Sequence, residues 1–459
     1  MQNEKQYLAP VKYGVLGICI LFFLTWLFFD GIKVAVDTAS YVNFDVTREP
    51  LYPTILAMFR FLFGGASYFW WVGAFQCILT GYAVWKVSDV LSRIFHLGFF
   101  STGAVLFFQI AVCMMTRFLA GRKTLYCLAM ETEGLAIPLF LLFFIHLFSY
   151  LANESKRELV LTYLYAFLLI LLRKQMFITL IIMGVMWFLS VLRKKLSFKR
   201  FVVYTSLLAG VVALTGLTER TYNYAVHGRA IERTTDVTML IPCLFAAQPQ
   251  DAAAIADESL KEVFLEMLSE IERQGWGYEN APDSLWGLQE FYADNYDNIS
   301  YKVLKPTLRK YVAEKEGDDY LSQSVAFDQQ VEKLLKSTAF QNMGRKIKIL
   351  SSNLFCGLMN TVAKNHRLLV GYTIGICLLF IAFLSLNGKK PACKNETILG
   401  ELVLVSVLIN IGVVALMIFT QSRYMIYNMP LFYIALYLML RGIILNSEKG
   451  LVRLKKWIK

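Results

Sequence analysis

Long apolar runs are the feature that most constrains this chain. Ten segments of 14 to 23 residues consist almost entirely of apolar side chains, and a helix needs about 20 such residues to cross the hydrocarbon layer of a membrane. The segments are Val11–Phe29, Ser67–Val87, Ile94–Thr116, Gly134–Leu151, Leu159–Leu172, Met176–Leu192, Phe201–Leu217, Leu368–Leu386, Ile398–Phe419 and Met425–Ile444. The pattern predicts an all-α polytopic membrane protein with about ten transmembrane helices.

The composition points the same way. Of the 459 residues, 57% are hydrophobic and 17% are charged, whereas soluble proteins average about 45–50% and 25%. An ordinary soluble enzyme and a disordered chain are both excluded. The sequence has no Walker motif, no GxGxxG and no sustained heptad run, which argues against an ATP-driven pump.

Lysine and arginine in the short loops predict the orientation, because such loops stay on the cytoplasmic side. With the N-terminus inside, the basic clusters of alternate loops all fall inside, as does the tail Lys449–Lys459. Val11–Phe29 is interpreted as a retained first span, since no small-x-small cleavage site follows it. Ile349–Ala363 is short and carries Ser, Asn and Gly, so we interpret it as an interfacial helix rather than an eleventh span.

Three regions follow from this topology. Residues 1–217 form an N-terminal module of seven spans, 218–367 an external segment, and 368–459 a C-terminal module of three spans. From Glu219 to Arg367 there are 17 Lys and Arg against 21 Asp and Glu, so the excess of the +12 net charge belongs to the membrane modules. The charge is therefore interpreted as a topology signal, and nucleic acid is excluded as a partner.

The external segment is predicted to be a mostly helical cap. Apolar residues recur at three and four positions in Ser259–Leu268 and in Tyr320–Leu335, which is typical of amphipathic helices. Breaks are expected at Gly275, Gly277, Pro282 and Pro306. The eight cysteines include no CxxC pair and the four histidines are far apart, so neither a zinc site nor a disulfide framework is predicted.

The first external loop, residues 30–66, contains the first candidate residues. Asp37 and Asp45 follow a span closely, where a carboxylate is placed to act as a general base. Tyr41 lies between them, and Arg48-Glu49-Pro50-Leu51-Tyr52-Pro53 follows. The Pro-Leu-Tyr-Pro sequence is expected to form a turn that opens an amphipathic interfacial helix, Thr54–Phe63.

This arrangement resembles the GT-C superfamily, polytopic glycosyltransferases that take sugar from a polyprenyl-phosphate carrier and include protein O-mannosyltransferases and lipid A aminoarabinose transferases. The resemblance rests on Asp37, Tyr41 and the stretch from Arg48 to Pro53, including Glu49 and Tyr52. It implies that Asp37 deprotonates an acceptor hydroxyl, with Asp45 as the second candidate. It also implies an inverting single displacement without a covalent nucleophile.

Three further places match the resemblance. Glu131 and Glu133, at the outer entry to the fourth span, would orient hydroxyls or share a divalent cation with Asp37. Arg173 and Lys174 lie between two spans, where charges are usually functional, and would hold the carrier phosphate. Arg423 and Tyr424 open the last span and match a further phosphate contact.

The sequence therefore predicts an enzyme that moves a sugar from a polyprenyl-phosphate carrier to an acceptor hydroxyl outside the membrane. The expected acceptor is a cell-envelope protein, polymer or glycolipid. A divalent cation is compatible with the sequence, which requires no cofactor. Arg117, Arg122 and Lys123 are weaker candidates for attracting anionic lipid.

Two alternatives stay open. A lipid-linked oligosaccharide polymerase or ligase would use a basic cluster at the start of the external segment, namely Arg220, His227, Arg229 and Arg233. A lipid or sugar flippase or transporter would call for internal repeats and helices broken by Gly or Pro, for which the sequence gives no convincing sign.

Overall fold

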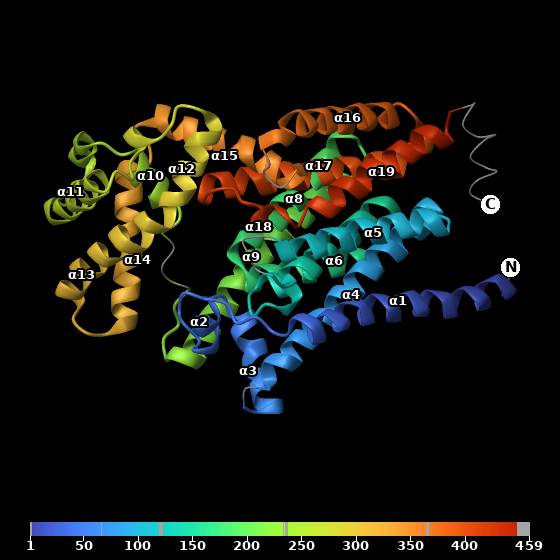
Figure 1. Ribbon diagram of the computed structural model, residues 1–459, viewed down its shortest axis with the longest axis horizontal. Helices are drawn as coiled ribbons and strands as arrows, with labels where there is room; N and C mark the ends of the chain where they lie inside the picture. The colour runs from blue at the N-terminus through green and yellow to red at the C-terminus, as the bar shows by residue number, and fades with distance from the viewer. Residues whose placement is uncertain are drawn as a thin grey trace. The chain divides into compact units, whose positions relative to one another are not determined.

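The computed structural model describes residues 2–65, 67–118, 123–232, 234, 237–363 and 367–447. The fold is 82% helical, and the part described contains no β-strand (Figure 1). Seven helical segments in these ranges are long and apolar enough to cross a membrane: Lys12–Asp30, Phe99–Phe118, Glu133–Asn153, Lys174–Leu192, Phe198–His227, Val370–Gly388 and Pro391–Met417. The prediction of an all-α protein with multiple apolar helices is confirmed.

The chain divides into two compact units. Unit 1 comprises Met1–Ile231, Gly371–Ile409 and Ile426–Lys459, and unit 2 comprises Glu232–Val370 and Asn410–Met425. The helix that begins at Phe198 continues to His227, so the first residues of the predicted external segment extend a helix of unit 1.

Unit 1 contains the N-terminal helices α1 (Gln2–Asp30), α4 (Tyr68–Phe95), α5 (Phe99–Met115), α6 (Glu133–Asn153), α7 (Lys156–Leu172), α8 (Ile178–Leu192) and α9 (Phe198–His227). At its centre is α6, in which every residue from Glu133 to Tyr150 except Ile137 is buried. It packs against α4 and α7, and α1 lies along α4. A Cβ at Gly81 would lie 2.8 Å from the Ile20 Cα, so this glycine is what lets α1 and α4 approach closely.

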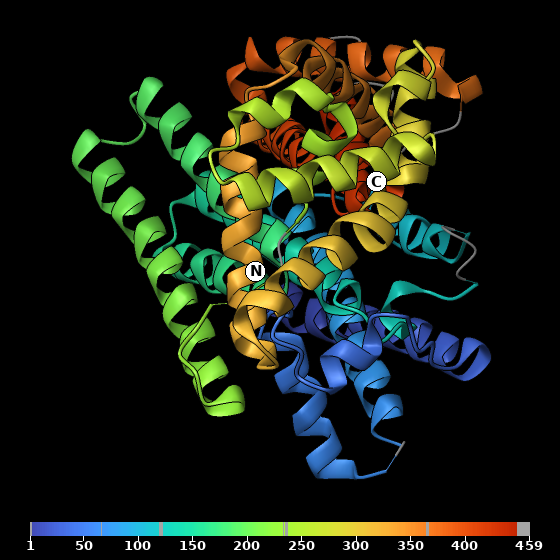
Figure 2. The same ribbon diagram turned by 90° about the vertical axis from the view of Figure 1, so that its left-hand side faces the viewer.

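Some predicted boundaries in unit 1 are wrong. The third apolar run was expected to begin at Ile94, but α4 extends through Phe95 and a left-handed His96 ends it before α5. Arg173 is extended and ends α7, which packs on α6 and α9. Helix α8 runs antiparallel beside α9, as the two green helices of Figure 2 show.

Short elements connect these helices on the side of unit 1 where α6 begins. They are α2 (Thr38–Val42), α3 (Leu51–Phe63), η1 (Thr116–Phe118), η2 (Tyr126–Leu128) and η3 (Lys174–Phe177). The predicted turn at Pro50–Pro53 is instead the first turn of α3, which starts at Leu51 rather than Thr54. Proline is tolerated there because the first N–H groups of a helix have no intrahelical acceptor.

The remaining helices of the C-terminal region are α16 (Val370–Gly388), η8 (Pro391–Cys393), α17 (Lys394–Met417), α18 (Ser422–Met425) and α19 (Met429–Leu445). The last span was expected to start at Met425, but α19 begins at Met429, with Pro430 in its first turn. Within unit 1, α17 and the start of α19 are joined by a bond of 2.6 Å from the Ser406 hydroxyl to the Asn428 side-chain oxygen. The basic tail Lys449–Lys459 lies outside the described residues.

Unit 2 is a helical body with its own core. Its elements are α10 (Leu240–Ala246), η4 (Pro249–Ala254), α11 (Glu258–Arg273), η5 (Tyr278–Asn280), α12 (Leu285–Asn298), the π-helix η6 (Ile299–Leu304), α13 (Lys305–Glu316), α14 (Tyr320–Thr338), α15 (Met343–Ala363) and η7 (Arg367–Leu369). The end of α17, from Asn410, and α18 also belong to it. Phe245, Phe264, Tyr292 and Phe327 are among its largest buried side chains.

The two helices predicted in this segment occur as α11 and α14, and Asp257 and Asp319 cap their N-termini. The break expected at Pro306 is wrong. Helical structure is continuous from Leu285 to Glu316, and the proline follows directly on the π-helix as the second residue of α13. The π-turn is wider than an α-turn and leaves room for the proline ring, which cannot donate an N–H to the preceding turn.

Helix α15 covers the segment interpreted as an interfacial helix, and it is not among the long apolar helices. Its buried face carries polar as well as apolar side chains, and the polar ones bind the segment between α17 and α18. The Asn353 amide donates to the Ile418 carbonyl, the Thr420 hydroxyl donates back to the Asn353 carbonyl, and Ser422 donates to the Asn360 side chain. This polar face fixes the segment that precedes Arg423.

Candidate functional site

Two loops of unit 1 that are distant in sequence are joined by a short parallel bridge. The Lys33 N–H donates to the Leu128 carbonyl and the Met130 N–H donates to the Lys33 carbonyl, each at 2.9 Å. The Thr38 hydroxyl donates to the Met130 carbonyl at 2.9 Å and is buried. The segment that carries Asp37 therefore lies against the segment that leads to Glu131 and Glu133.

Asp37 and Arg48 form an ion pair within the first loop. The Arg48 Nη2 donates to the Asp37 Oδ1 at 2.7 Å, and its Nε donates to the Ser40 hydroxyl at 2.8 Å. The guanidinium also lies 4.7 Å from the centre of the Tyr41 ring. The Asp37 side chain is 38% exposed, so this carboxylate is held in place and still accessible from solvent.

Tyr41 reports the electrostatics of the cluster. Burial raises the pKa of its hydroxyl to about 12, the charges of Glu133 and Asp37 add to the rise, and Arg48 and Arg173 oppose it. Its ring meets that of Tyr52 edge-on, with 5.1 Å between ring centres. Burial likewise raises the pKa of Tyr52 well above its usual value. Both phenols are neutral hydrogen-bonding groups at physiological pH.

Glu133, the first residue of α6, is paired with Arg173 at the turn between α7 and α8. The Arg173 Nη1 donates to the Glu133 Oε1 at 2.5 Å, and the Glu133 side chain is fully buried. The N-terminus of α6 also favours the carboxylate. Beside this pair, the buried Glu49 accepts the Lys174 N–H at 2.9 Å. The turn between α7 and α8 is thus bound to both loops.

The two cations of this turn differ in their surroundings. Arg173 is bound to a buried carboxylate. The Lys174 side chain is half-buried, and its ammonium forms no ion pair with any carboxylate that the structure describes. Lys174 therefore retains the capacity to bind an anion.

Gln76 is a functional candidate that the sequence reasoning missed. It is fully buried on α4, and its Nε2 donates to the Cys127 carbonyl at 3.0 Å and to the Ala129 carbonyl at 3.2 Å. Its Oε1 accepts from the Tyr52 hydroxyl at 3.2 Å. A single amide thus fixes α3 and the loop before α6. The available signal was a glutamine within an apolar run, because a polar side chain in such a run needs partners.

Other predicted residues form structural contacts outside this cluster. The Asp45 carboxylate accepts the Thr47 N–H at 2.9 Å and so stabilises the turn that leads to Arg48. Arg117 donates twice to the buried Asp30, at 2.8 and 2.6 Å, and stacks on Trp26. Arg122 lies outside the described residues.

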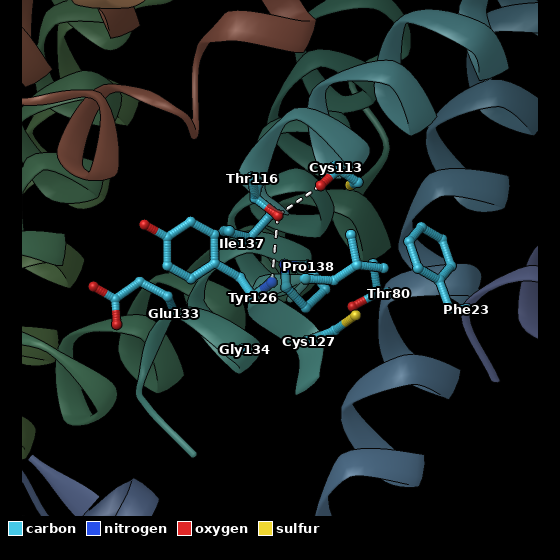
Figure 3. Close-up of a pocket in the computed structure, with 11 residues that line it drawn as sticks. Phe23, Thr80, Cys113, Thr116, Tyr126, Cys127, Glu133, Gly134, Ile137 and Pro138 are labelled. Atoms are coloured by element: carbon cyan, nitrogen blue, oxygen red, sulfur yellow. Dashed lines mark hydrogen bonds between the residues drawn. The ribbon is translucent and has the colours of Figure 1, made fainter. Parts of the chain in front are cut away.

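A pocket lies behind Glu133, between α1, α4, α5 and α6 (Figure 3). It is lined by Phe23, Thr80, Cys113, Thr116, Leu125, Tyr126, Cys127, Glu133, Gly134, Ile137 and Pro138. The Glu133 carboxylate stands at one end, and the Cys127 sulfur lies toward the other. Its cavity volume is about 20 Å³, room for about one water molecule. A lipid-linked sugar does not fit there.

Arg423 and Tyr424 belong to unit 2 and are both half-buried. The Asn410 amide donates to the Tyr424 carbonyl at 2.9 Å. The other predicted site residues belong to unit 1, and the described cluster is complete within that unit. Of the alternative basic cluster, Arg220 and His227 lie on the last turns of α9 and Arg229 follows it, whereas Arg233 lies outside the described residues.

No group of three His, Cys, Asp or Glu side chains gathers as a metal site among the residues described here. In comparisons with known proteins, no protein-family model, curated protein or solved structure matches the chain.

Proposed function

We propose that the protein is an integral-membrane glycosyltransferase that moves a sugar from a polyprenyl-phosphate carrier to an acceptor hydroxyl on the outer face of the membrane. The observation that carries the proposal is the convergence of three distant segments. The Asp37–Arg48 pair, the Glu133–Arg173 pair and the contact of Glu49 with the Lys174 N–H bring an exposed carboxylate and an available cation into one cluster.

The proposed topology has ten spans, with the cluster outside and both termini in the cytoplasm. Besides the seven long apolar helices, it counts α4, α7 and α19 as spans. These three coincide with apolar runs of the sequence, and α4 has 28 residues, which at 1.5 Å per residue exceeds the thickness of the hydrocarbon layer. The start of α6 and the end of α7 then lie on the same side as the first loop.

Asp37 is the general base in this proposal. It takes the proton of the acceptor hydroxyl as the acceptor oxygen attacks the anomeric carbon, and the bond from that carbon to the phosphate oxygen breaks on the opposite face, which inverts the sugar. Asp37 is favoured over Asp45 because the Asp45 carboxylate is used in a local turn. Glu133, which is fully buried and paired, positions Arg173 and the turn between α7 and α8.

Lys174 is the favoured phosphate ligand in unit 1. A cation that binds the leaving phosphate lowers the cost of its departure, and a charge-assisted hydrogen bond to phosphate is about twice as strong as a neutral one. Arg173 is already neutralised by Glu133, whereas Lys174 has no such partner among the described side chains. Arg423, in unit 2, is a separate candidate for binding phosphate.

The test uses the full chain reconstituted with a detergent extract of whole cell envelopes, whose lipids, proteins and polymers supply polyprenyl-phosphate sugars and all three classes of acceptor. The readout is polyprenyl phosphate released, measured by mass spectrometry, because this product is the same whichever sugar is transferred. Asp37→Asn should lower the rate by about 100-fold or more, the usual contribution of a general base, and Asp45→Asn should lower it by less than about tenfold. If the wild-type chain releases no polyprenyl phosphate, the proposed function is wrong. If Asp45→Asn is the inactive variant, the base is misassigned.

A further inference from the structure

Two cysteines of unit 1 that are 50 positions apart in sequence are in side-chain contact. The Sγ atoms of Cys77, on α4, and Cys127, on η2, lie 3.9 Å apart. Cys77 is fully buried and Cys127 is 5% exposed. No CxxC spacing signals this pair, because it arises from packing of the loop before α6 against α4.

The contact is fixed by the residue next to Cys77. Gln76 donates to the Cys127 carbonyl at 3.0 Å, so two consecutive residues of α4 bind the same residue of η2, one through its backbone and one through its sulfur. Because the fold already brings the two thiols together, their reaction has the high effective concentration of an oriented intramolecular step. Disulfide sulfurs are about 2.05 Å apart, so a movement of about 2 Å closes the gap.

We propose that Cys77 and Cys127 form a disulfide that fastens the loop carrying Glu131 and Glu133 to α4. The two S–H bonds break, one S–S bond forms, and two electrons and two protons pass to an oxidant. A small-molecule or protein disulfide is the class of oxidant required, and it is reduced to two thiols. The bond forms as η2 packs against α4 during folding, when the two thiols have met and the oxidant still has access to them. It requires an oxidising compartment, and η2 is predicted to lie outside. Gln76 lies against Gly134, at the predicted outer end of the fourth span, so Cys77 is close to the level of that outer end although the second apolar run begins at Ser67.

A third thiol lies nearby and defines the competing assignment. Cys113 lines the same pocket as Cys127 (Figure 3). The structure gives the sulfur contact to Cys77, and no sulfur contact between Cys113 and Cys127 is found in the part of the chain described. The proposed disulfide therefore leaves Cys113 as a thiol.

The experiment counts thiols in the full-length protein isolated from membranes in the presence of N-ethylmaleimide, denatured without reductant and analysed by intact mass. Six of the eight cysteines should be alkylated, and a non-reducing digest should yield one linked pair of peptides, containing Cys77 and Cys127. Alkylation of all eight, or a link through Cys113, overturns the proposal.

Single variants make the assignment specific. Cys77→Ser and Cys127→Ser should each leave seven cysteines that are all alkylated, because either change frees the partner thiol. The control Cys377→Ser, on α16, should leave five alkylated and the linked pair intact. Loss of the linked peptide pair in the Cys377→Ser control contradicts the proposal. A linked pair between other cysteines in Cys77→Ser contradicts it as well. The count does not depend on enzyme activity, so it is independent of the proposed glycosyl transfer.

Discussion

The ion pair between Glu133 and Arg173 gives the most quantitative prediction about unit 1. The Glu133 side chain is fully buried and Arg173 is 17% exposed, with 2.5 Å between the bonded atoms. Replacing Arg173 by methionine keeps most of the side-chain volume but leaves a buried carboxylate without its charge partner. Such a change costs about 3–5 kcal/mol of unfolding free energy.

An exposed pair of the same type provides the matched control. Arg273 and Glu270 on α11 form a bidentate pair, with Arg273 68% exposed. Exposed pairs contribute at most about 1 kcal/mol, so Arg273→Met should change stability little. The double variant Glu133→Gln with Arg173→Met should recover much of the loss, because it removes both buried charges together.

The assay is thermal or denaturant-induced unfolding of the full chain in detergent, followed for the wild type, the single variants and the double variant under one set of conditions. The order of stability expected is wild type and Arg273→Met highest, the double variant intermediate and Arg173→Met lowest. Equal losses from Arg173→Met and Arg273→Met would refute the argument from burial. A double variant less stable than Arg173→Met would refute the coupling between the two charges.

Three further predictions concern residues of the cluster. A Cβ at Gly134 would lie 2.6 Å from the Gln76 Oε1, so Gly134→Ala should lower the unfolding free energy by about 1–3 kcal/mol through overpacking. The control Gly103→Ala, on α5, meets nothing within 4 Å and should raise the unfolding free energy by up to about 1 kcal/mol. Equal melting temperatures of the two variants would contradict both expectations. The pKa of Tyr41 is raised from 10 to about 12 in the folded state, so the neutral phenol stabilises the fold below pH 10 and this stabilisation is lost between pH 10 and 12. The unfolding free energy of Tyr41→Phe should therefore fall less than that of the wild type between pH 9 and pH 11.5, as unfolding curves at these two pH values would show. Lys174→Ala should weaken binding of polyprenyl phosphate to the reconstituted chain by about 10-fold or more, whereas a change below twofold would exclude Lys174 as a phosphate ligand.

The sequence predicted the elements that depend on local patterns. Each of the ten apolar runs contains most or all of a helix, although the third and the last also cross a helix boundary. Run length and apolar content are local properties, so they can be read from the sequence alone. The helices predicted from the amphipathic segments Ser259–Leu268 and Tyr320–Leu335 are also present, as α11 and α14. Errors occurred at helix ends and at prolines. Pro53 lies in the first turn of α3, where a missing N–H costs nothing, and Pro306 follows a π-turn inside a continuous helical stretch.

The side-chain contacts of the candidate site could not be predicted from local sequence patterns. Glu133 pairs with Arg173 across 40 positions, and Gln76 bonds to residues 24 to 53 positions away. These contacts arise from packing of distant segments, which no local pattern encodes. The sequence marked charged residues as unusual in an apolar chain but gave no measure of which charges neutralise each other. Only the structure shows that Arg173 is paired with the buried Glu133, whereas Lys174 forms no ion pair with a described carboxylate.

Binding of a polyprenyl-phosphate carrier by this cluster in unit 1 is the central claim, and cross-linking with a photoreactive polyprenyl phosphate tests it most directly. The full chain in membranes is irradiated with the probe, digested and mapped by mass spectrometry, with and without excess polyprenyl phosphate. We predict competed cross-links in the first external loop, in residues 124–133 and in the turn around Lys174, and their loss in Lys174→Ala. Cross-links confined to other regions, or unaffected by the competitor, would contradict the claim.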